Sequence, residues 1–168
     1  MPADPLPVEF DAEAIVRVLN EHAVEYVLIG GLACVLHGAP IGTVDVDITP
    51  ARSEANLARL AAALRELDAR LRVPGKPEPV EVPLDARTFR LMRTVTFRTR
   101  AGDLDVALLP DGTDGYADLV RGRVEITIDD VVFPVASLAD VIRSKAAAAR
   151  PKDLAVLDLL REVAAREG

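Results

Sequence analysis

The stretch that decides the fold covers residues 24–49 and reads VEYVLIGGLACVLHGAPIGTVDVDIT. Its first six residues are mostly apolar and partly β-branched, which predicts a strand. Gly30 and Gly31 interrupt that strand, and the apolar segment 32–36 after them predicts a short helix. Residues 43–49 then alternate between polar and apolar side chains, which predicts a second strand.

The alternation places two acidic residues, Asp45 and Asp47, on one face of the second strand. Side chains two residues apart on a strand are separated by roughly 6.5–7 Å. Two carboxylates at that spacing repel each other unless a cation lies between them, and hard oxygen ligands suit Mg²⁺ or Mn²⁺. The alternative is a pair of solvent-facing aspartates on an edge strand.

The glycine pair Gly30-Gly31 follows a predicted strand and precedes a predicted helix. Glycines at such a turn let backbone N–H groups approach an anion closely, and a helix N-terminus favours phosphate. The alternative is a tight turn without a ligand. Together with the aspartate pair, the turn predicts a site for a triphosphate and divalent metal ions.

A third carboxylate is predicted from a hairpin. Residues 91–99 and 104–109 are expected to be its strands, with residues 100–103 as the turn. Asp105 stands between apolar residues on the second strand, where a buried carboxylate needs a cation or a metal ion. Asp103 points the same way and is the rival candidate, but its expected place in the turn favours Asp105.

These features resemble the nucleotidyltransferase superfamily that includes DNA polymerase β, and more narrowly the small bacterial toxins of type IV toxin–antitoxin systems. The resemblance covers about residues 24–160 and rests on Gly30-Gly31, His37-Gly38, Thr43, Asp45-Val-Asp47, Asp105, Lys145 and Arg150-Pro-Lys-Asp153. It implies an α/β (α+β) fold: a mixed β-sheet flanked by helices, with C-terminal helices over residues 137–166.

The resemblance also implies an enzyme that moves a nucleoside monophosphate from an NTP to an acceptor hydroxyl. Asp45, Asp47 and Asp105 would hold Mg²⁺ or Mn²⁺, and Asp105 would accept the acceptor's proton. The residues expected at the nucleotide are Gly30, Gly31, Thr43, Arg98, Lys145 and Lys152. The acceptor could be RNA or tRNA, a protein or a small molecule, and a cognate antitoxin or toxin is an expected partner.

Three of the predicted residues keep a second interpretation. Arg98 belongs to an arginine-rich segment, residues 87–100, that could simply be a solvated surface. Asp153 could favour the dipole of the helix that it begins. His37, alone in an apolar segment, is expected to be a hydrogen-bonded structural residue.

One departure from the resembled pattern concerns nucleotide binding. Many relatives carry an arginine shortly before the motif threonine, and this chain has Ile41 and Gly42 there. The alternative function is therefore a non-catalytic module, an antitoxin or regulator, that binds nucleotide or protein.

The composition sets outer limits on the whole chain. Its 168 residues, half of them apolar, predict a single globular domain whose first ten residues, with three prolines, are flexible. A net charge of −7 argues against indiscriminate nucleic-acid binding. No membrane span or export signal is expected, and a single cysteine, Cys34, fits a cytoplasmic protein.

Overall fold

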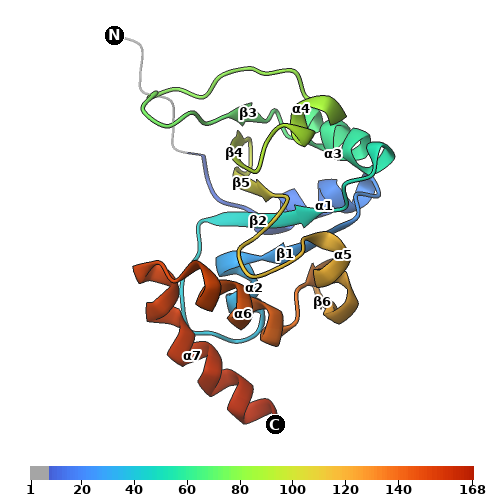
Figure 1. Cartoon of the computed structure of the whole chain (residues 1–168). Coiled ribbons are helices and arrows are strands. Elements are labelled where there is room, and N and C mark those ends of the chain that lie inside the picture. Colours follow the sequence, from blue (N-terminus) through green and yellow to red (C-terminus); the bar gives the residue numbers. More distant parts are fainter. Residues whose placement is uncertain (1–7) are drawn as a thin grey trace.

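The computed structural model describes residues 8–168, and within them seven strands form one mixed sheet in the order β3-β4-β5-β2-β1-β7-β6 (Figure 1). The strands are β1 Tyr26–Ile29, β2 Asp45–Pro50, β3 Arg70–Leu71, β4 Thr94–Thr99, β5 Gly102–Ala107, β6 Val124–Ile128 and β7 Val131–Val135. The helices are α1 Ala12–Glu21, α2 Gly30–Leu36, α3 Glu54–Glu66, α4 Ala86–Arg90, α5 Tyr116–Leu119, α6 Leu138–Ala148 and α7 Pro151–Glu167. The predicted fold class, a mixed sheet with flanking and C-terminal helices, is confirmed.

Two parallel contacts give the sheet its mixed character. β2 pairs in parallel with β5, and β1 pairs in parallel with β7, while the remaining neighbours are antiparallel. The β2–β5 contact brings the predicted Asp-Val-Asp strand beside the predicted strand of Asp105. The central position of β2 also means that its aspartates do not lie on an edge strand.

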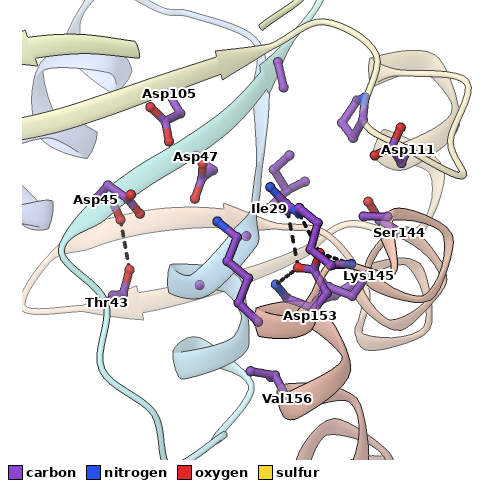
Figure 2. A pocket seen from close by; sticks show the side chains of 18 of the residues that line it. Ile29, Thr43, Asp45, Asp47, Asp105, Asp111, Ser144, Lys145, Asp153 and Val156 are labelled. Carbon is purple, nitrogen blue, oxygen red and sulfur yellow. Dashed lines mark hydrogen bonds and ion pairs between the residues drawn. The ribbon is translucent and has the colours of Figure 1, made fainter. Parts of the chain in front are cut away.

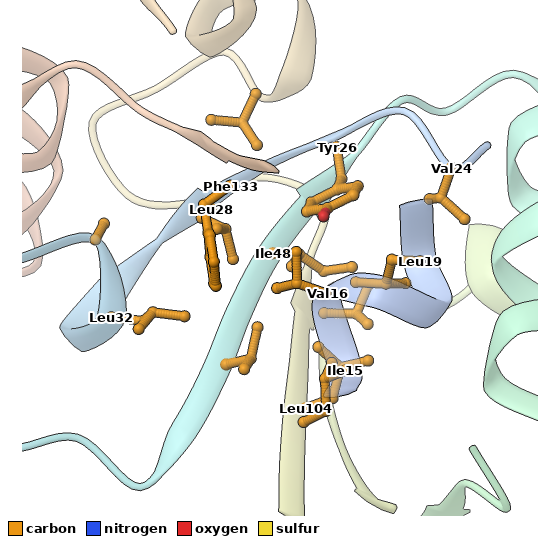
Figure 3. Close-up of a cluster of buried hydrophobic side chains, with 14 of the residues drawn as sticks. Ile15, Val16, Leu19, Val24, Tyr26, Leu28, Leu32, Ile48, Leu104 and Phe133 are labelled. Carbon is orange, nitrogen blue, oxygen red and sulfur yellow. The ribbon is translucent and has the colours of Figure 1, made fainter. Parts of the chain in front are cut away.

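The main core lies against one face of this sheet. Ile48 on β2, Leu104 on β5 and Leu28 on β1 pack with Ile15 and Leu19 of α1, and all five side chains are fully buried (Figure 3). Because side chains alternate along a strand, the aspartates of β2 and β5 point to the opposite face. α2 packs against β1 and β2, and it also contacts α6, which packs against α7 (Figure 1).

Helix starts follow the capping residues that the sequence offers. The side chains of Asp11, Ser53 and Ser137 accept hydrogen bonds from backbone N–H groups in the first turns of α1, α3 and α6, respectively. Such caps satisfy backbone donors that have no partner inside the helix. The sequence also predicts two short strands, residues 124–128 and 131–135, around Asp129-Asp130 as a hairpin turn; the structure confirms this hairpin, with both aspartates at positive φ.

The structure corrects the predictions between residues 66 and 103. The apolar spacing that runs to Leu71 predicts one helix, but α3 ends at Glu66 and Leu71 lies in β3. Residues 86–90 form α4, capped by Asp85, where no helix is predicted. Phe89 of α4 packs edge-on against Phe97 of β4, with ring centroids 6.1 Å apart, which explains why this short helix is held in place.

The β4–β5 hairpin is tighter than predicted. Thr99 pairs with Gly102, so only two residues form the turn, and Asp103 lies within β5. The expectation that Asp103 is a turn residue is wrong, because Asp103 pairs with Arg98 and the pairing with β4 continues to Gly102, the residue immediately before it.

The expected flexible N-terminal segment lies mostly outside the described residues. Residues 1–7 are among those not described, whereas Phe10 packs against Gly102 and Asp11 donates its backbone N–H to the carbonyl of Ala101 at 2.9 Å. These contacts therefore fix the path of the backbone from residue 10 onward. Among residues 8–168, no helix has both the length and the apolar character needed to cross a membrane.

Candidate active site

Three aspartates from two neighbouring strands meet on the open face of the sheet. Asp47 on β2 is the register partner of Asp105 on β5, and Asp45 lies two residues before Asp47 on the same face. One carboxylate oxygen from each of the three residues lies within 4.8 Å of the others (Figure 2). The rival, Asp103, is not a member of this group.

The donor set fits a hard divalent cation. The site offers carboxylate oxygens, the ligands that Mg²⁺ and Mn²⁺ prefer. Moreover, the Oδ1 atom of Asp105 is buried and has no hydrogen-bond partner, although buried polar atoms are usually bonded. A cation between the three carboxylates would satisfy that oxygen.

Burial and the proximity of the three carboxylates raise the pKa values of Asp45 and Asp47. Burial raises the pKa of Asp47 to about 8, helped by the side chain of Asp105, with which a protonated Asp47 can share its proton, and by the charge of Asp45. Burial and the charge of Asp105 also raise the pKa of Asp45, while Lys152 opposes that rise. Cation binding would relieve both effects.

The glycine turn lies directly beside Asp47. Gly30 has φ +69°, and a Cβ at this position would overlap the carboxylate of Asp47. A Cβ on Gly31 would come within 3.0 Å of the Thr43 hydroxyl, which donates to the carbonyl of Asp45 at 3.2 Å. Glycine is therefore required at residue 30, while a Cβ at residue 31 would crowd Thr43, and both glycines keep this wall of the site free of side chains.

Cationic side chains reach the site from the C-terminal helices. Lys145 on α6 donates to Asp153 on α7 at 3.3 Å, and its charge opposes the pKa rise of Asp47. Asp153 has no exposed side-chain surface and also accepts from the Nε of Arg150 at 2.6 Å. Asp153 is thus a buried anchor that holds two cations, rather than a residue that only favours the helix dipole.

A cavity of about 480 Å³ joins these groups. It is lined by eight of the predicted residues: Gly30, Gly31, Thr43, Asp45, Asp47, Asp105, Lys145 and Lys152. Ile41 and Gly42, which replace the expected arginine, also line it. The cavity is thus bounded by the aspartates and the glycine turn on one side and by α6 and α7 on the other (Figure 2).

Of the residues expected at the metal ions and the nucleotide, Arg98 alone does not line the cavity. Its Nε donates to Asp103 at 2.6 Å, and Arg72 donates to the same carboxylate at 2.7 Å. Asp103 is the register partner of both Asp45 and Arg98, so this ion cluster adjoins the three aspartates on the side of β4.

The other arginines of residues 87–100 are dispersed. Arg93 lines the cavity, Arg90 pairs with Glu54 at 3.7 Å, and Arg100 donates to the carbonyl of Glu66. They do not form a continuous basic rim. His37 bonds to the carbonyl of Ala136 through Nε2 at 2.8 Å, which confirms the structural role expected for it.

Sequence reasoning gave no role to several polar residues that line the cavity, among them Thr94, Asp111, Asp140 and Ser144. Asp111 and Ser144 face it beside Lys145, and Arg150 joins it through Asp153 (Figure 2). For Ser144 the signal was its place immediately before Lys145. Nothing in the sequence around Asp111 marks it, because the loop after β5 has no motif.

Three solved structures share this architecture. A proposed nucleotidyltransferase from Thermotoga maritima aligns with TM-score 0.52 at 18% identity, covering 89% of this chain and 87% of its own. The lincosamide antibiotic adenylyltransferase LnuA, with lincomycin bound, aligns with TM-score 0.60 at 14% identity and coverages of 92% and 99%. The antibiotic-resistance factor ANT(2″)-Ia aligns with TM-score 0.57 at 16% identity and coverages of 92% and 80%.

These likenesses establish that the chain has the nucleotidyltransferase fold. No protein-family model matches the sequence, and no curated protein matches it either. At identities below 20%, the fold is what the three structures share with this chain.

Proposed function

We propose that this protein is a metal-dependent nucleotidyltransferase that moves a nucleoside monophosphate from an NTP to an acceptor hydroxyl. The observation that carries the proposal is the cluster of Asp45, Asp47 and Asp105 beside a side-chain-free glycine turn, facing lysines across one cavity. Two of the similar structures, an adenylyltransferase and a proposed nucleotidyltransferase, support this reaction class.

Each group in the cavity has a role in that reaction. The backbone at Gly30 and Gly31 receives the triphosphate, and Thr43 fixes the start of β2 through its bond to the Asp45 carbonyl. Lys145 and Lys152 neutralise phosphate charge from α6 and α7. Asp105 accepts the proton of the attacking hydroxyl.

The three aspartates would hold Mg²⁺ or Mn²⁺. Such ions, when bound, polarise the α-phosphate and neutralise the charge that develops on the leaving pyrophosphate. The unpartnered oxygen of Asp105 and the raised pKa of Asp47 are the features that favour cation binding here.

The missing arginine at residues 41–42 motivates an alternative, a non-catalytic module that binds nucleotide or a partner protein. Lys152 weakens this alternative, because its charge acts on Asp45 and it lines the same cavity as Ile41. Lys152 therefore supplies, from α7, a positive charge to the cavity that Ile41 and Gly42 also line.

The test is transfer of label from each α-³²P-NTP to cell extract with Mg²⁺, comparing the wild type with Asp47→Asn. We expect a labelled product from the wild type and at least a hundredfold less from the variant. Asp158→Asn is the control, because Asp158 is an exposed aspartate of α7 that pairs with Arg161 at 3.8 Å, away from the cavity. Equal labelling by the wild type and Asp47→Asn would refute the proposal.

Calorimetry with each NTP and Mg²⁺ distinguishes the enzyme from the non-catalytic module. NTP binding without pyrophosphate release in the presence of extract would favour the non-catalytic module. An acceptor in the RNA fraction of the extract would support the toxin-like role that the sequence resemblance suggests, and a small-molecule acceptor would exclude it.

A further inference from the structure

Under the proposed function, the position of the triphosphate determines from which side of the three aspartates the acceptor approaches. Gly30 and Gly31 lie at the β1 side of Asp47, and Lys145 and Lys152 face them from α6 and α7. Transfer of a phosphoryl-type group proceeds with the attacking and leaving oxygens roughly in line. With the triphosphate on the β1 side, the acceptor hydroxyl must come from the side of β5 and β4.

The surface on that side is an open strip of sheet. Thr96 of β4 is the register partner of Asp105, and Arg98 is the partner of Asp103. Register partners point to the same face, so these side chains share the face of the three aspartates. Thr94 is exposed and Thr96 is half-buried, which leaves room for a ligand over β4.

Two arginines dominate the charge of this strip. Arg98 uses its Nε on Asp103 and Arg72 uses its Nη1, and the two side chains are 40% and 51% exposed. An arginine carries five donors, and within residues 8–168 no other acceptor bonds the remaining guanidinium N–H groups of either residue. Arg93 adds a third positive charge where the strip meets the cavity.

The balance of charge favours one class of ligand. Asp103 is the only carboxylate in contact with Arg72 and Arg98 among the described residues, so the cluster retains one net positive charge. The charges of Asp45, Asp47 and Asp105 are compensated by cations in the working enzyme. A polycationic acceptor would therefore meet arginines here, whereas a phosphate would find the paired donors that it binds best.

We infer that the acceptor is a phosphate-bearing molecule, with Arg72 and Arg98 binding a phosphate close to the hydroxyl that is modified. In the reaction, the hydroxyl oxygen forms a bond to the α-phosphorus, and the bond from that phosphorus to pyrophosphate breaks. The hydroxyl proton passes to Asp105, and pyrophosphate leaves on the side of Lys145. The phosphate can belong to a mononucleotide or to the backbone of an RNA strand.

The test measures ligand binding by the full chain with Mg²⁺ and a non-hydrolysable NTP analogue present. The probe is a short fluorescent single-stranded RNA with a free 3′-hydroxyl, and the competitors are AMP, adenosine and an aminoglycoside. We expect RNA binding that AMP displaces at least tenfold better than adenosine does, and the aminoglycoside should not displace it. Displacement by AMP at concentrations near the RNA Kd indicates a terminal phosphate, and much weaker displacement indicates the RNA backbone.

Arg72→Gln and Arg98→Gln are each expected to weaken RNA binding about tenfold. Each should also lower the slope of log K against log salt concentration by about 0.7, a change that a general loss of structure does not produce. Arg98→Lys keeps the charge but loses the paired donors, so it should keep the salt dependence of the wild type and recover only part of the lost affinity. The matched control is Arg17→Gln, another ion-paired surface arginine, which bonds Asp130 at 3.1 Å.

Two results would overturn the inference while leaving the proposed function intact. One is NTP-analogue binding without RNA or AMP binding. The other is tighter binding of the aminoglycoside than of RNA. Failure of the analogue itself to bind in calorimetry would instead refute the proposed function.

Discussion

Asp47 and Asp105 lie directly opposite each other on the parallel strands β2 and β5, although they come from distant parts of the chain. Among residues 8–168, neither carboxylate forms an ion pair with a cationic side chain, and one buried oxygen of Asp105 has no hydrogen-bond donor. This pairing is costly in the absence of a cation, because burial and mutual repulsion both oppose two charges.

The first prediction concerns divalent cations. Because the folded state alone assembles the three carboxylates, Mg²⁺ or Mn²⁺ at a hundred times its Kd should stabilise the wild type by about 2.7 kcal/mol. Thermal unfolding of EDTA-treated protein with added metal measures this. Asp105→Asn should remove most of the effect, and an undiminished rise in Tm for that variant would argue that the metal binds elsewhere.

The second prediction concerns pH. Burial raises the pKa of Asp47 to about 8, so the folded state holds this proton where an unfolded chain, with an ordinary aspartate pKa near 4, has lost it. Metal-free protein should therefore lose stability as the pH rises from about 4 to about 8, and level off above that. Denaturant unfolding in EDTA across this range measures the slope.

The matched variant for the pH experiment is Asp47→Asn, which removes the titrating group but keeps its shape. It should be more stable than the wild type at pH 8 by about 2 kcal/mol, or roughly 5 °C in Tm. Parallel pH profiles for the two proteins would contradict the assignment.

The third prediction concerns the glycine turn. Gly30→Ala places a Cβ in the Asp47 carboxylate and imposes a positive φ on alanine, so it should cost about 2–4 kcal/mol and abolish transfer. Gly75→Ala is the control, because Gly75 has φ +82° with open space around it. It should cost only about 1 kcal/mol of backbone strain and leave transfer unchanged. Urea unfolding and the labelling assay measure both variants, and equal losses would show that the close approach to Asp47 is unimportant.

The fourth prediction concerns the buried anchor on α7. Asp153→Ala leaves Lys145 without its carboxylate in a position that is 14% exposed, and it also removes a bond to the backbone N–H of Arg150. We expect a loss of about 3 kcal/mol, since breaking a buried ion pair strands the remaining charge. Asp153→Asn keeps an acceptor for that N–H and should lose less. Asp158→Ala, an exposed aspartate of the same helix, should change the free energy of unfolding by under about 0.5 kcal/mol.

Local patterns sufficed to predict much of the site. The alternation around Asp45 and Asp47 gave β2 its two faces, and the apolar neighbours of Asp105 marked a strand rather than a loop. The family resemblance implied that these carboxylates meet, but the parallel pairing of β2 with β5 that brings them together was not predicted from the sequence.

Other features could not be predicted from the sequence because they depend on contacts between distant residues. α4 is short and owes its stability to the packing of Phe89 on Phe97, which no local spacing reveals. Leu71 continues the apolar spacing of α3, yet the helix ends earlier, Asp68 adopts φ +53° and the chain turns to pair with β4. The bond between Lys145 and Asp153 joins two helices across a left-handed Ala149, so their motif residues could be predicted but their contact could not.

The two faces of the sheet have a consequence for how this protein tolerates change. Along β2, Val46 and Ile48 point into the core while Asp45 and Asp47 point to the cavity, and β5 repeats the pattern with Leu104 and Asp105. In a saturation scan of these strands, the phenotype should alternate from residue to residue. Substitutions at core-facing residues should lower the amount of folded protein, and substitutions at cavity-facing residues should leave an abundant but inactive protein. Selection can therefore retune the chemistry of this chain without disturbing what keeps it folded.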